Sequence, residues 1–236
     1  MKWAWAIPWV AVAACAAQSD PAPELLKLAH IKLAMVTTLE RQPNYTCVQE
    51  VERSRRRLPR KRFELHDTLR LEVALVDGKE MFAWPGARKF EQTDLTQMIA
   101  GGAIGTGDFA LHARAVFQSR APVFDYRGGE EMRGRRVDRF DFRVTQLNSG
   151  YHIRSGGHDA VVGYHGSLWA DAVSHQLVRL EVNADDIPAE LGIREARDVM
   201  DYDRMRIGES DFLLPSGSEL TMTDLAGNES RNRTQF

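Results

Sequence analysis

Apolar residues fall on alternate positions in one stretch after another of this 236-residue chain. The first stretch uses odd positions: Phe63, Leu65, Leu69, Leu71, Val73 and Leu75. Later stretches repeat the pattern: Phe140, Phe142 and Val144, then Val162, Tyr164 and Leu168, then Val178, Leu180 and Val182. Side chains of a β-strand point alternately to the two faces of a sheet, so a period of two predicts strands with one buried face.

Turn residues between these stretches predict an antiparallel series of about nine to eleven strands. Asp77-Gly78 is typical of a tight hairpin turn, and Gly128-Gly129 is read as another turn. Near the C-terminus we expect strands over 212–214 and 219–225, separated by a turn at Ser216-Gly217. A sheet of this size must curl to bury one face.

Two helical segments interrupt the strand pattern. A helix is predicted over about 22–41, with an apolar face formed by Leu26, Ala29, Leu33 and Val36, joined by Leu25, Leu28 and Leu39. A helical insertion is predicted over about 91–118, interrupted by a glycine hinge over 101–107. The fold class is therefore α+β and mainly β: a strongly curved antiparallel sheet (an incomplete barrel) with both helical segments packed on its concave side.

The N-terminal residues 1–17 have the pattern of a secretory signal peptide, because Lys2 precedes about fifteen apolar or small residues. Cys15 follows Val12-Ala13-Ala14, which fits an attachment site for a lipid anchor. The same residues also fit ordinary cleavage before Gln18, so two outcomes stay open. Either way the sequence predicts export, to the periplasm or to a place associated with the outer membrane.

The remaining residues, 18–236, suit a single domain. Hydrophobic residues make up 43% of the chain and charged residues 27%, which is typical of a folded globular protein. The formal net charge of −2 gives no overall field that would favour nucleic acid. Once Cys15 is lipidated or removed, Cys47 stands alone, so we expect no internal disulfide and no cysteine-based metal site. We also expect a monomer.

The densest group of charges is a basic run in which seven of ten positions carry a cation: Arg53, Arg55, Arg56, Arg57, Arg60, Lys61 and Arg62. One interpretation is a patch for anionic headgroups or another anionic partner. The other is a solvated hairpin end, with Leu58-Pro59 at its turn. No aromatic residue interleaves with these cations, which argues against nucleic acid.

Residue patterns for catalysis are weak. His158, Asp159 and His165 form the most suggestive cluster, but on one strand residues 158 and 165 point to opposite faces. Gly166-Ser167-Leu168 lacks the second glycine of a nucleophile elbow. We therefore predict no catalytic residue, no metal and no cofactor, and keep a hydrolase or metalloenzyme as the least favoured alternative.

Three stretches resemble exported proteins of acidobacteria, and through them the LolA-like superfamily of outer-membrane lipoprotein-sorting carriers. They are Pro43–Cys47 with Arg53–Arg56, Tyr164–Asp171, and Asn228–Thr234. The resemblance implies a curved sheet closed by helices around an apolar cavity, with no catalytic residues. In relatives we expect at least one more strand beyond the position of Phe236, including a cysteine as partner for Cys47. This chain would then be a truncated version with an unpaired Cys47 and a weakened sheet edge at the C-terminus.

The expected function is a non-enzymatic cell-envelope protein that binds a lipid, a lipoprotein acyl chain or another apolar ligand inside the curved sheet. The candidate lining is the apolar face of the strands: Leu69, Leu71, Phe140, Phe142, Tyr164 and Leu168. The alternative is a periplasmic sensor or interaction module without lipid cargo. Its envelope-protein partner would contact the basic run or the glycine hinge.

Overall fold

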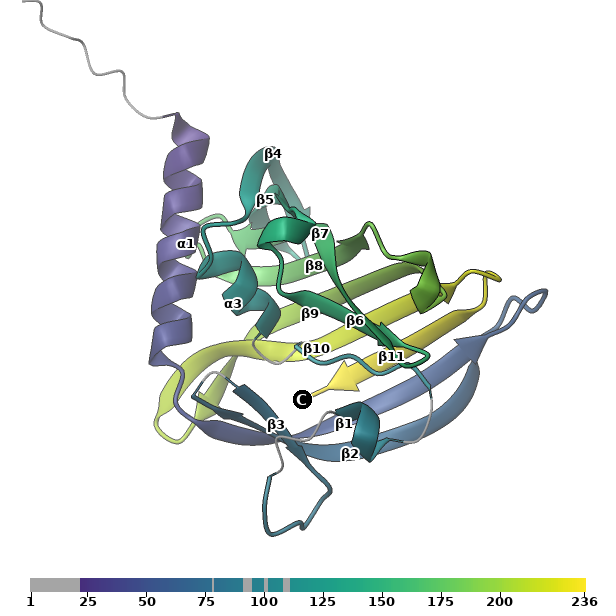
Figure 1. The fold of residues 1–236 in the computed structure, drawn as a ribbon. Coiled ribbons are helices and arrows are strands. Elements are labelled where there is room, and N and C mark those ends of the chain that lie inside the picture. Colours follow the sequence, from purple (N-terminus) through teal and green to yellow (C-terminus); the bar gives the residue numbers. More distant parts are fainter. Residues whose placement is uncertain (1–21, 78, 91–94, 100–101, 108–110) are drawn as a thin grey trace, which may run out of the picture.

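One eleven-stranded antiparallel sheet dominates the computed structural model, which describes residues 22–236 except 78, 91–94, 100–101 and 108–110 (Figure 1). The first strands are β1 (Tyr45–Arg56), β2 (Glu64–Val76), β3 (Lys79–Ala83), β4 (Val123–Met132), β5 (Arg135–Val144) and β6 (Tyr151–Ser155). The others are β7 (His158–Asp171), β8 (Leu177–Asp185), β9 (Ile193–Ile207), β10 (Ser210–Asp224) and β11 (Glu229–Gln235). Their order is β3-β2-β1-β11-β10-β9-β8-β7-β5-β4, and β6 pairs with β7.

The sheet is strongly curved and stays open, because its order ends at β3 on one side and β4 on the other (Figure 1). The helices α1 (Pro23–Arg41), α2 (Leu95–Met98) and α3 (Leu111–Phe117) contribute side chains to the core beside the strands. Two 3-10 turns, Gln146–Asn148 and Ala189–Leu191, connect strands. The predicted fold class is confirmed: a mainly antiparallel, curved sheet with an N-terminal helix and a helical insertion.

The predicted apolar face of the N-terminal helix was wrong at its centre, although Leu39 is buried and Leu28 packs against the core as expected. Ile31, Met35 and Leu39 are its buried residues, spaced one turn apart. Leu26 and Leu33, at the centre of the predicted face, are 46% and 66% exposed. The helix therefore carries two apolar stripes. Leu26 and Leu33 belong to the stripe on the side away from the core.

Two predicted turns are bulges inside long strands. Gly128 lies within β4, where the register to β5 shifts between Tyr126 and Gly128, and the chain reverses later at Arg133-Gly134. Both turn residues have positive φ (52° and 73°), as a two-residue hairpin turn requires. Likewise the expected break at Ser216-Gly217 is a register shift within the continuous strand β10. A bulge bends a strand without ending it, so glycine alone could not distinguish the two.

The C-terminal strand β11 lies inside the sheet, paired with β1 on one side and β10 on the other (Figure 1). The expectation of a weakened sheet edge at the C-terminus was therefore wrong. Seven residue pairs join β1 to β11, and seven join β10 to β11. This short final strand thus connects the N-terminal hairpin to the rest of the sheet.

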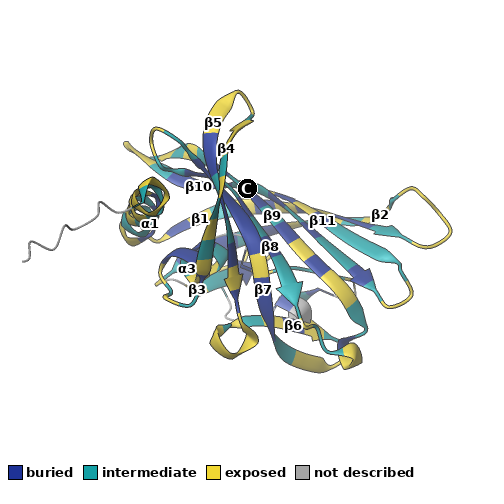
Figure 2. Ribbon diagram, turned by 90° about the horizontal axis from the view of Figure 1, so that it is seen from above, coloured by how far each residue is buried: buried dark blue, intermediate teal, exposed yellow. Residues whose placement is uncertain are grey.

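The core divides into two main apolar clusters, and burial alternates along most strands (Figure 2). The first cluster joins the strands β5, β7, β8 and β9 to α1 and α3 through residues such as Ile31, Met35, Phe117 and Leu180. The second joins β1, β2 and β3 to α2 and to one end of β10. Within the described part of the chain, no helix is both long and apolar enough to span a bilayer.

Candidate functional site

The six candidate lining residues fall into both clusters. Phe140, Phe142, Tyr164 and Leu168 lie together in the first cluster, beneath α1 and α3. Leu71 is buried in the second cluster, with Leu69 packed against it. The structure thus brings four of the six together and places the two leucines of β2 in a separate apolar region.

Helical side chains fill the space above the first cluster. Ile31, Met35 and Leu39 of α1 and Val116 and Phe117 of α3 are all at most 3% exposed. Aromatic contacts continue across the strands: the ring centroids of Phe142 and Tyr164 are 6.2 Å apart, edge to face. In this conformation the four lining residues belong to a closed, well-packed core.

Two hollows among the described residues are small. A depression of about 150 Å³ lies near the ends of β8 and β9, and Leu177, Tyr202 and Arg204 are among the residues around it. A second hollow, between Phe82, Phe236 and the glycine segment 105–107, leaves no room for a water molecule. Both are smaller than the ~300–1,000 Å³ typical of ligand pockets. An apolar ligand the size of an acyl chain would need its space to be opened.

A row of buried polar residues crosses neighbouring strands of the sheet. Arg53 of β1, Asn232 of β11 and Asp198 of β9 lie in one cross-strand register, with Leu220 of β10 between the last two. Arg53 is 3% exposed, Asn232 4% and Asp198 2%. Buried polar groups of this kind must be hydrogen bonded or paired, and the helical insertion supplies several of the contacts.

The insertion touches this polar row at three strands. Asn232 donates a hydrogen bond from Nδ2 to the carbonyl oxygen of Ala103 at 3.0 Å. A Cβ atom on Gly102 would lie 2.8 Å from a guanidinium nitrogen of Arg53, and the φ of Gly102, +82°, is a conformation that favours glycine. His112 of α3 places Nε2 3.6 Å from Oδ2 of Asp198. The glycine segment and α3 are therefore fastened to the sheet by polar contacts.

Sequence reasoning missed His112, Asp198 and Asn232 as a group. The signal for Asp198 was present, since Ala196, Met200 and Tyr202 share its even-numbered register and are all buried. A charged residue in a buried register marks an internal polar contact. Its partner His112 lies 86 positions earlier in the sequence, and no local pattern connects the two.

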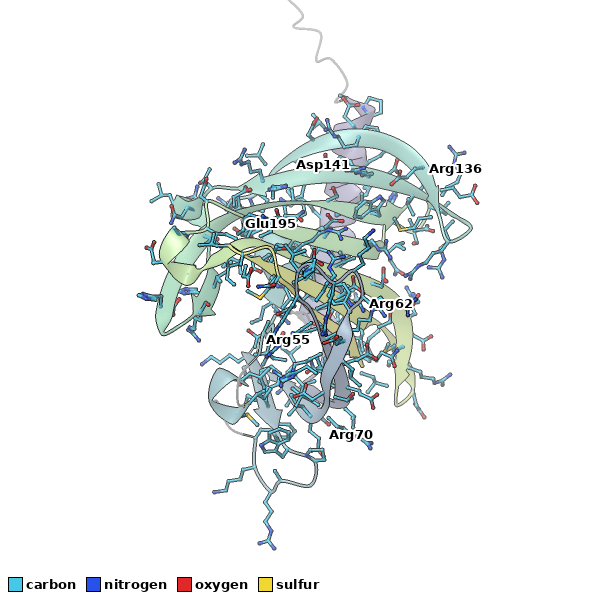
Figure 3. All side chains as sticks on the ribbon, turned by 90° about the vertical axis from the view of Figure 1, so that its right-hand side faces the viewer. Arg55, Arg62, Arg70, Arg136, Asp141 and Glu195 are labelled. Atoms are coloured by element: carbon cyan, nitrogen blue, oxygen red, sulfur yellow. The ribbon has the colours of Figure 1, made fainter. Side chains whose placement is uncertain are left out.

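The basic run does not form one patch. Arg53 is buried and forms a two-point ion pair with Asp67, at 2.7 Å and 2.5 Å. Arg56 pairs with Glu229, and Arg60 with Glu64. Arg55 lies 3.4 Å from His66 (Figure 3 labels Arg55 and Arg62). The three remaining cations, Arg57, Lys61 and Arg62, are exposed at the hairpin end, as the solvated reading expects.

The Arg53 guanidinium lowers the pKa of the Asp67 carboxyl, because hydrogen bonds and charge both favour the ionised form. Lys27 of α1 has a raised pKa for the matching reason: its ammonium donates to Asp138 at 2.6 Å and contacts the Tyr126 hydroxyl. This second pair fastens α1 to the strands β4 and β5. Both pairs have an architectural role in this conformation.

The histidine cluster is not brought together. His165 contacts Asp185 at 2.7 Å, while Asp159 contacts His152 at 2.9 Å and Arg154 at 2.7 Å. Across the described residues, no group of three histidine, cysteine or acidic side chains could hold a metal ion. Cys15 and the signal peptide lie outside the described residues. Cys47 is a free thiol, and burial raises its pKa to about 12.

No protein-family model matches this sequence, and no curated protein matches it. Solved structures similar to this chain include an outer-membrane lipoprotein-sorting protein domain from Vibrio parahaemolyticus: 12% identity, TM-score 0.43, covering 86% of this chain and 88% of that one. A LolA superfamily protein from Nitrosomonas europaea has 11% identity and TM-score 0.36, with 87% and 91% covered. A DUF1329 family protein from Desulfovibrio piger has 9% identity and TM-score 0.41, with 89% and 91% covered.

Proposed function

We propose that this protein is a non-enzymatic carrier or receptor of the cell envelope that binds an acyl chain beneath its helical cover. The ligand would lie on the concave strands against Phe140, Phe142, Tyr164 and Leu168, in the space that α1 and α3 now fill. The apolar leader supports export to the envelope. The observation that carries the proposal is the apolar concave face of an open sheet, covered by helices with limited anchorage.

The anchorage of α1 is modest. It buries three apolar side chains, Ile31, Met35 and Leu39, and adds the ion pair between Lys27 and Asp138. Burying three such side chains stabilises by about 6 kcal/mol before the cost of ordering the helix is subtracted. An acyl chain gains about 0.8 kcal/mol per buried methylene, so about eight methylenes would offset the loss of these contacts. Displacement of α1 by a long acyl chain is therefore energetically reasonable.

The test is whether the protein takes up acyl chains and whether uptake depends on the cover. The full chain, extracted mildly from envelopes, would be examined by mass spectrometry for bound lipid. Uptake of a fluorescent fatty acid would then be followed with the wild type, with Met35→Ser and with Leu33→Ser. Met35 lies on the buried side of α1, and Leu33 is exposed on the same helix. We expect Met35→Ser to accelerate uptake and Leu33→Ser to leave it unchanged.

Absence of bound lipid, together with no fluorescence response in any of the three proteins, would refute acyl-chain binding. Circular dichroism of the sheet would show that Met35→Ser remains folded. Equal acceleration by both variants would mean that the probe binds an exposed surface instead.

A second candidate function is an interaction module whose contact surface is the end of the β1–β2 hairpin. Arg57, Lys61 and Arg62 are exposed there beside Leu58, which is 61% exposed. Exposed cations beside apolar side chains suit an acidic envelope partner. A pulldown from envelope extracts would compare the wild type with Arg57→Ser/Lys61→Ser/Arg62→Ser and with the control Arg88→Ser/Lys89→Ser, which removes two exposed cations elsewhere. Equal recovery of partners by all three would dismiss this surface.

A further inference from the structure

The helix α1 presents apolar side chains to solvent along its N-terminal half. Leu25, Leu26 and Leu33 are 58%, 46% and 66% exposed, and Ala29 between them is also exposed. We call these four residues the outer stripe. At 100° per residue they fall within one sector of the helix, centred about 130° around the axis from the buried stripe of Ile31, Met35 and Leu39.

Core packing does not explain the outer stripe. Figure 1 shows α1 standing beside the sheet as a separate rod, and Figure 2, viewed from above, shows it at the margin of the molecule. A surface helix ordinarily has one apolar stripe and an opposite polar face. A second apolar stripe in contiguous helical register marks a surface that is covered by something else.

We propose that the outer stripe lies on a lipid bilayer. The outer stripe is close in sequence to the apolar leader: residues 4–17 are apolar or small, and only residues 18–22 separate them from Pro23. Five intervening residues span at most about 20 Å when fully extended. While the leader is inserted, or while Cys15 carries a lipid, the first turns of α1 are therefore held next to the membrane surface.

The geometry suits a helix lying on the bilayer surface. Helices of this kind bury their apolar face ~5–10 Å deep, at the boundary between headgroups and acyl chains. The charges on α1 are mixed, with Glu24 and Glu40 beside Lys27, Lys32 and Arg41. Contact through the outer stripe is therefore driven by apolar burial and does not require anionic lipid.

A second copy of the chain is a less suitable occupant. Four side chains that are partly covered already offer on the order of 300 Å², whereas a stable protein interface needs about 800 Å² from each partner. A bilayer sets no such minimum here, because the leader or the lipid supplies the main anchorage and the outer stripe only adds to it. The proposal is independent of whether the protein carries an acyl-chain ligand.

The test is protection of single cysteines from a membrane-impermeant maleimide. The full chain, with Cys15→Ser and Cys47→Ser, would be synthesised in the presence of phosphatidylcholine vesicles, and labelling measured on the protein that floats with them. Test sites are Ala29→Cys and Leu33→Cys. Control sites are Glu24→Cys, exposed and about 150° around the same helix from the centre of the outer stripe, and Leu147→Cys, at a residue that is 93% exposed away from α1.

We expect labelling at positions 29 and 33 to slow about tenfold on vesicles, as for side chains at membrane-interface depth, with little change at 24 and 147. Equal rates with and without vesicles at all four sites would overturn the proposal. Equal slowing at position 24 would show general proximity and overturn the outer stripe as the contact. Protection that rises with protein concentration without vesicles would assign the stripe to a second copy. Circular dichroism would confirm that each variant is folded.

Discussion

Arg53 and Asp67 face each other across the β1–β2 pair and join through two hydrogen bonds, from Nε at 2.7 Å and from a terminal nitrogen at 2.5 Å. The arginine side chain is only 4% exposed, whereas the aspartate is 36% exposed. The partly exposed carboxylate of Asp67 therefore neutralises the charge of the buried Arg53 guanidinium. It also places the guanidinium against Gly102 of the helical insertion.

Replacing Asp67 by asparagine should destabilise the fold, because the buried guanidinium loses its counter-charge. Breaking a buried pair costs about 3–5 kcal/mol, and the partial exposure of Asp67 reduces the expected loss to about 2 kcal/mol. Urea unfolding would measure it. Glu64→Gln, which removes the partner of the exposed Arg60, is the matched control and should change the free energy of unfolding by less than about 0.5 kcal/mol. Similar losses in both variants would contradict the special role of the buried pair.

The same pair predicts a pH dependence. The pKa of Asp67 is lowered in the folded state by its hydrogen bonds to Arg53, so its contribution is fully present above the unfolded value, about 3.9. That contribution is lost as the pH falls through the folded value. The stability difference between wild type and Asp67→Asn should therefore be constant above about pH 5 and shrink in more acidic solution. A difference that grew on acidification would contradict this sign.

The strands could be predicted because their burial is local and periodic, but the position of Arg53 could not. In the sequence, Arg53 belongs to a run of cations, which predicts a solvent-exposed side chain. The structure places it in the odd-numbered register of β1 with Val51, facing the core, while its partner Asp67 comes from the next strand. Pairing across strands decides which members of a charged run are buried, and that information is not local.

For the N-terminal helix, the local pattern predicted the element but not which of its faces is buried. Its length followed from Pro23 and from the helical spacing of apolar residues, yet the helix contains two apolar stripes. Periodicity identifies a stripe without saying which surface covers it. The side of the helix that packs against the sheet carries Ile31, Met35 and Leu39, whereas the leucine-rich stripe is exposed. Similarly, the helices were expected on the concave side of the sheet, but the sequence did not show which side chains of α1 and α3 would pack against Phe140, Phe142, Tyr164 and Leu168.

The thiol of Cys47 should react slowly in the native protein. Burial raises its pKa to about 12, and only the thiolate is a good nucleophile. At pH 8 we expect reaction with Ellman's reagent to be at least about a hundredfold slower in the folded state than in 6 M guanidinium chloride. The Cys15→Ser background removes the other thiol and serves as the measured protein. Equally fast reaction in both states would show that Cys47 is accessible.

Replacing Lys27 by methionine should loosen α1 without unfolding the sheet. The ammonium donates to Asp138, which is buried, and to the Tyr126 hydroxyl, and methionine keeps most of the side-chain length. Because Lys27 is 38% exposed, we expect a loss of about 1 kcal/mol, equal to roughly fivefold faster amide exchange in α1. Hydrogen exchange would compare α1 with β8. Arg41→Met, which removes an exposed cation of the same helix, is the control, and equal acceleration in both variants would discount the pair.

Gly166 should tolerate no side chain, because the backbone of β8 passes directly over it. A Cβ atom built on Gly166 would lie 1.8 Å from the carbonyl oxygen of Glu181 and 2.8 Å from the ring of Phe142. Alanine would therefore force β7 and β8 apart beneath the first cluster, at a cost of more than about 3 kcal/mol. Gly129→Ala is the matched control, since its added methyl would make only ordinary contacts, the nearest at 3.7 Å. Thermal unfolding should show a large drop for Gly166→Ala and a small change for Gly129→Ala. A Gly166→Ala protein as stable as the wild type would mean that β7 and β8 are not paired in this register.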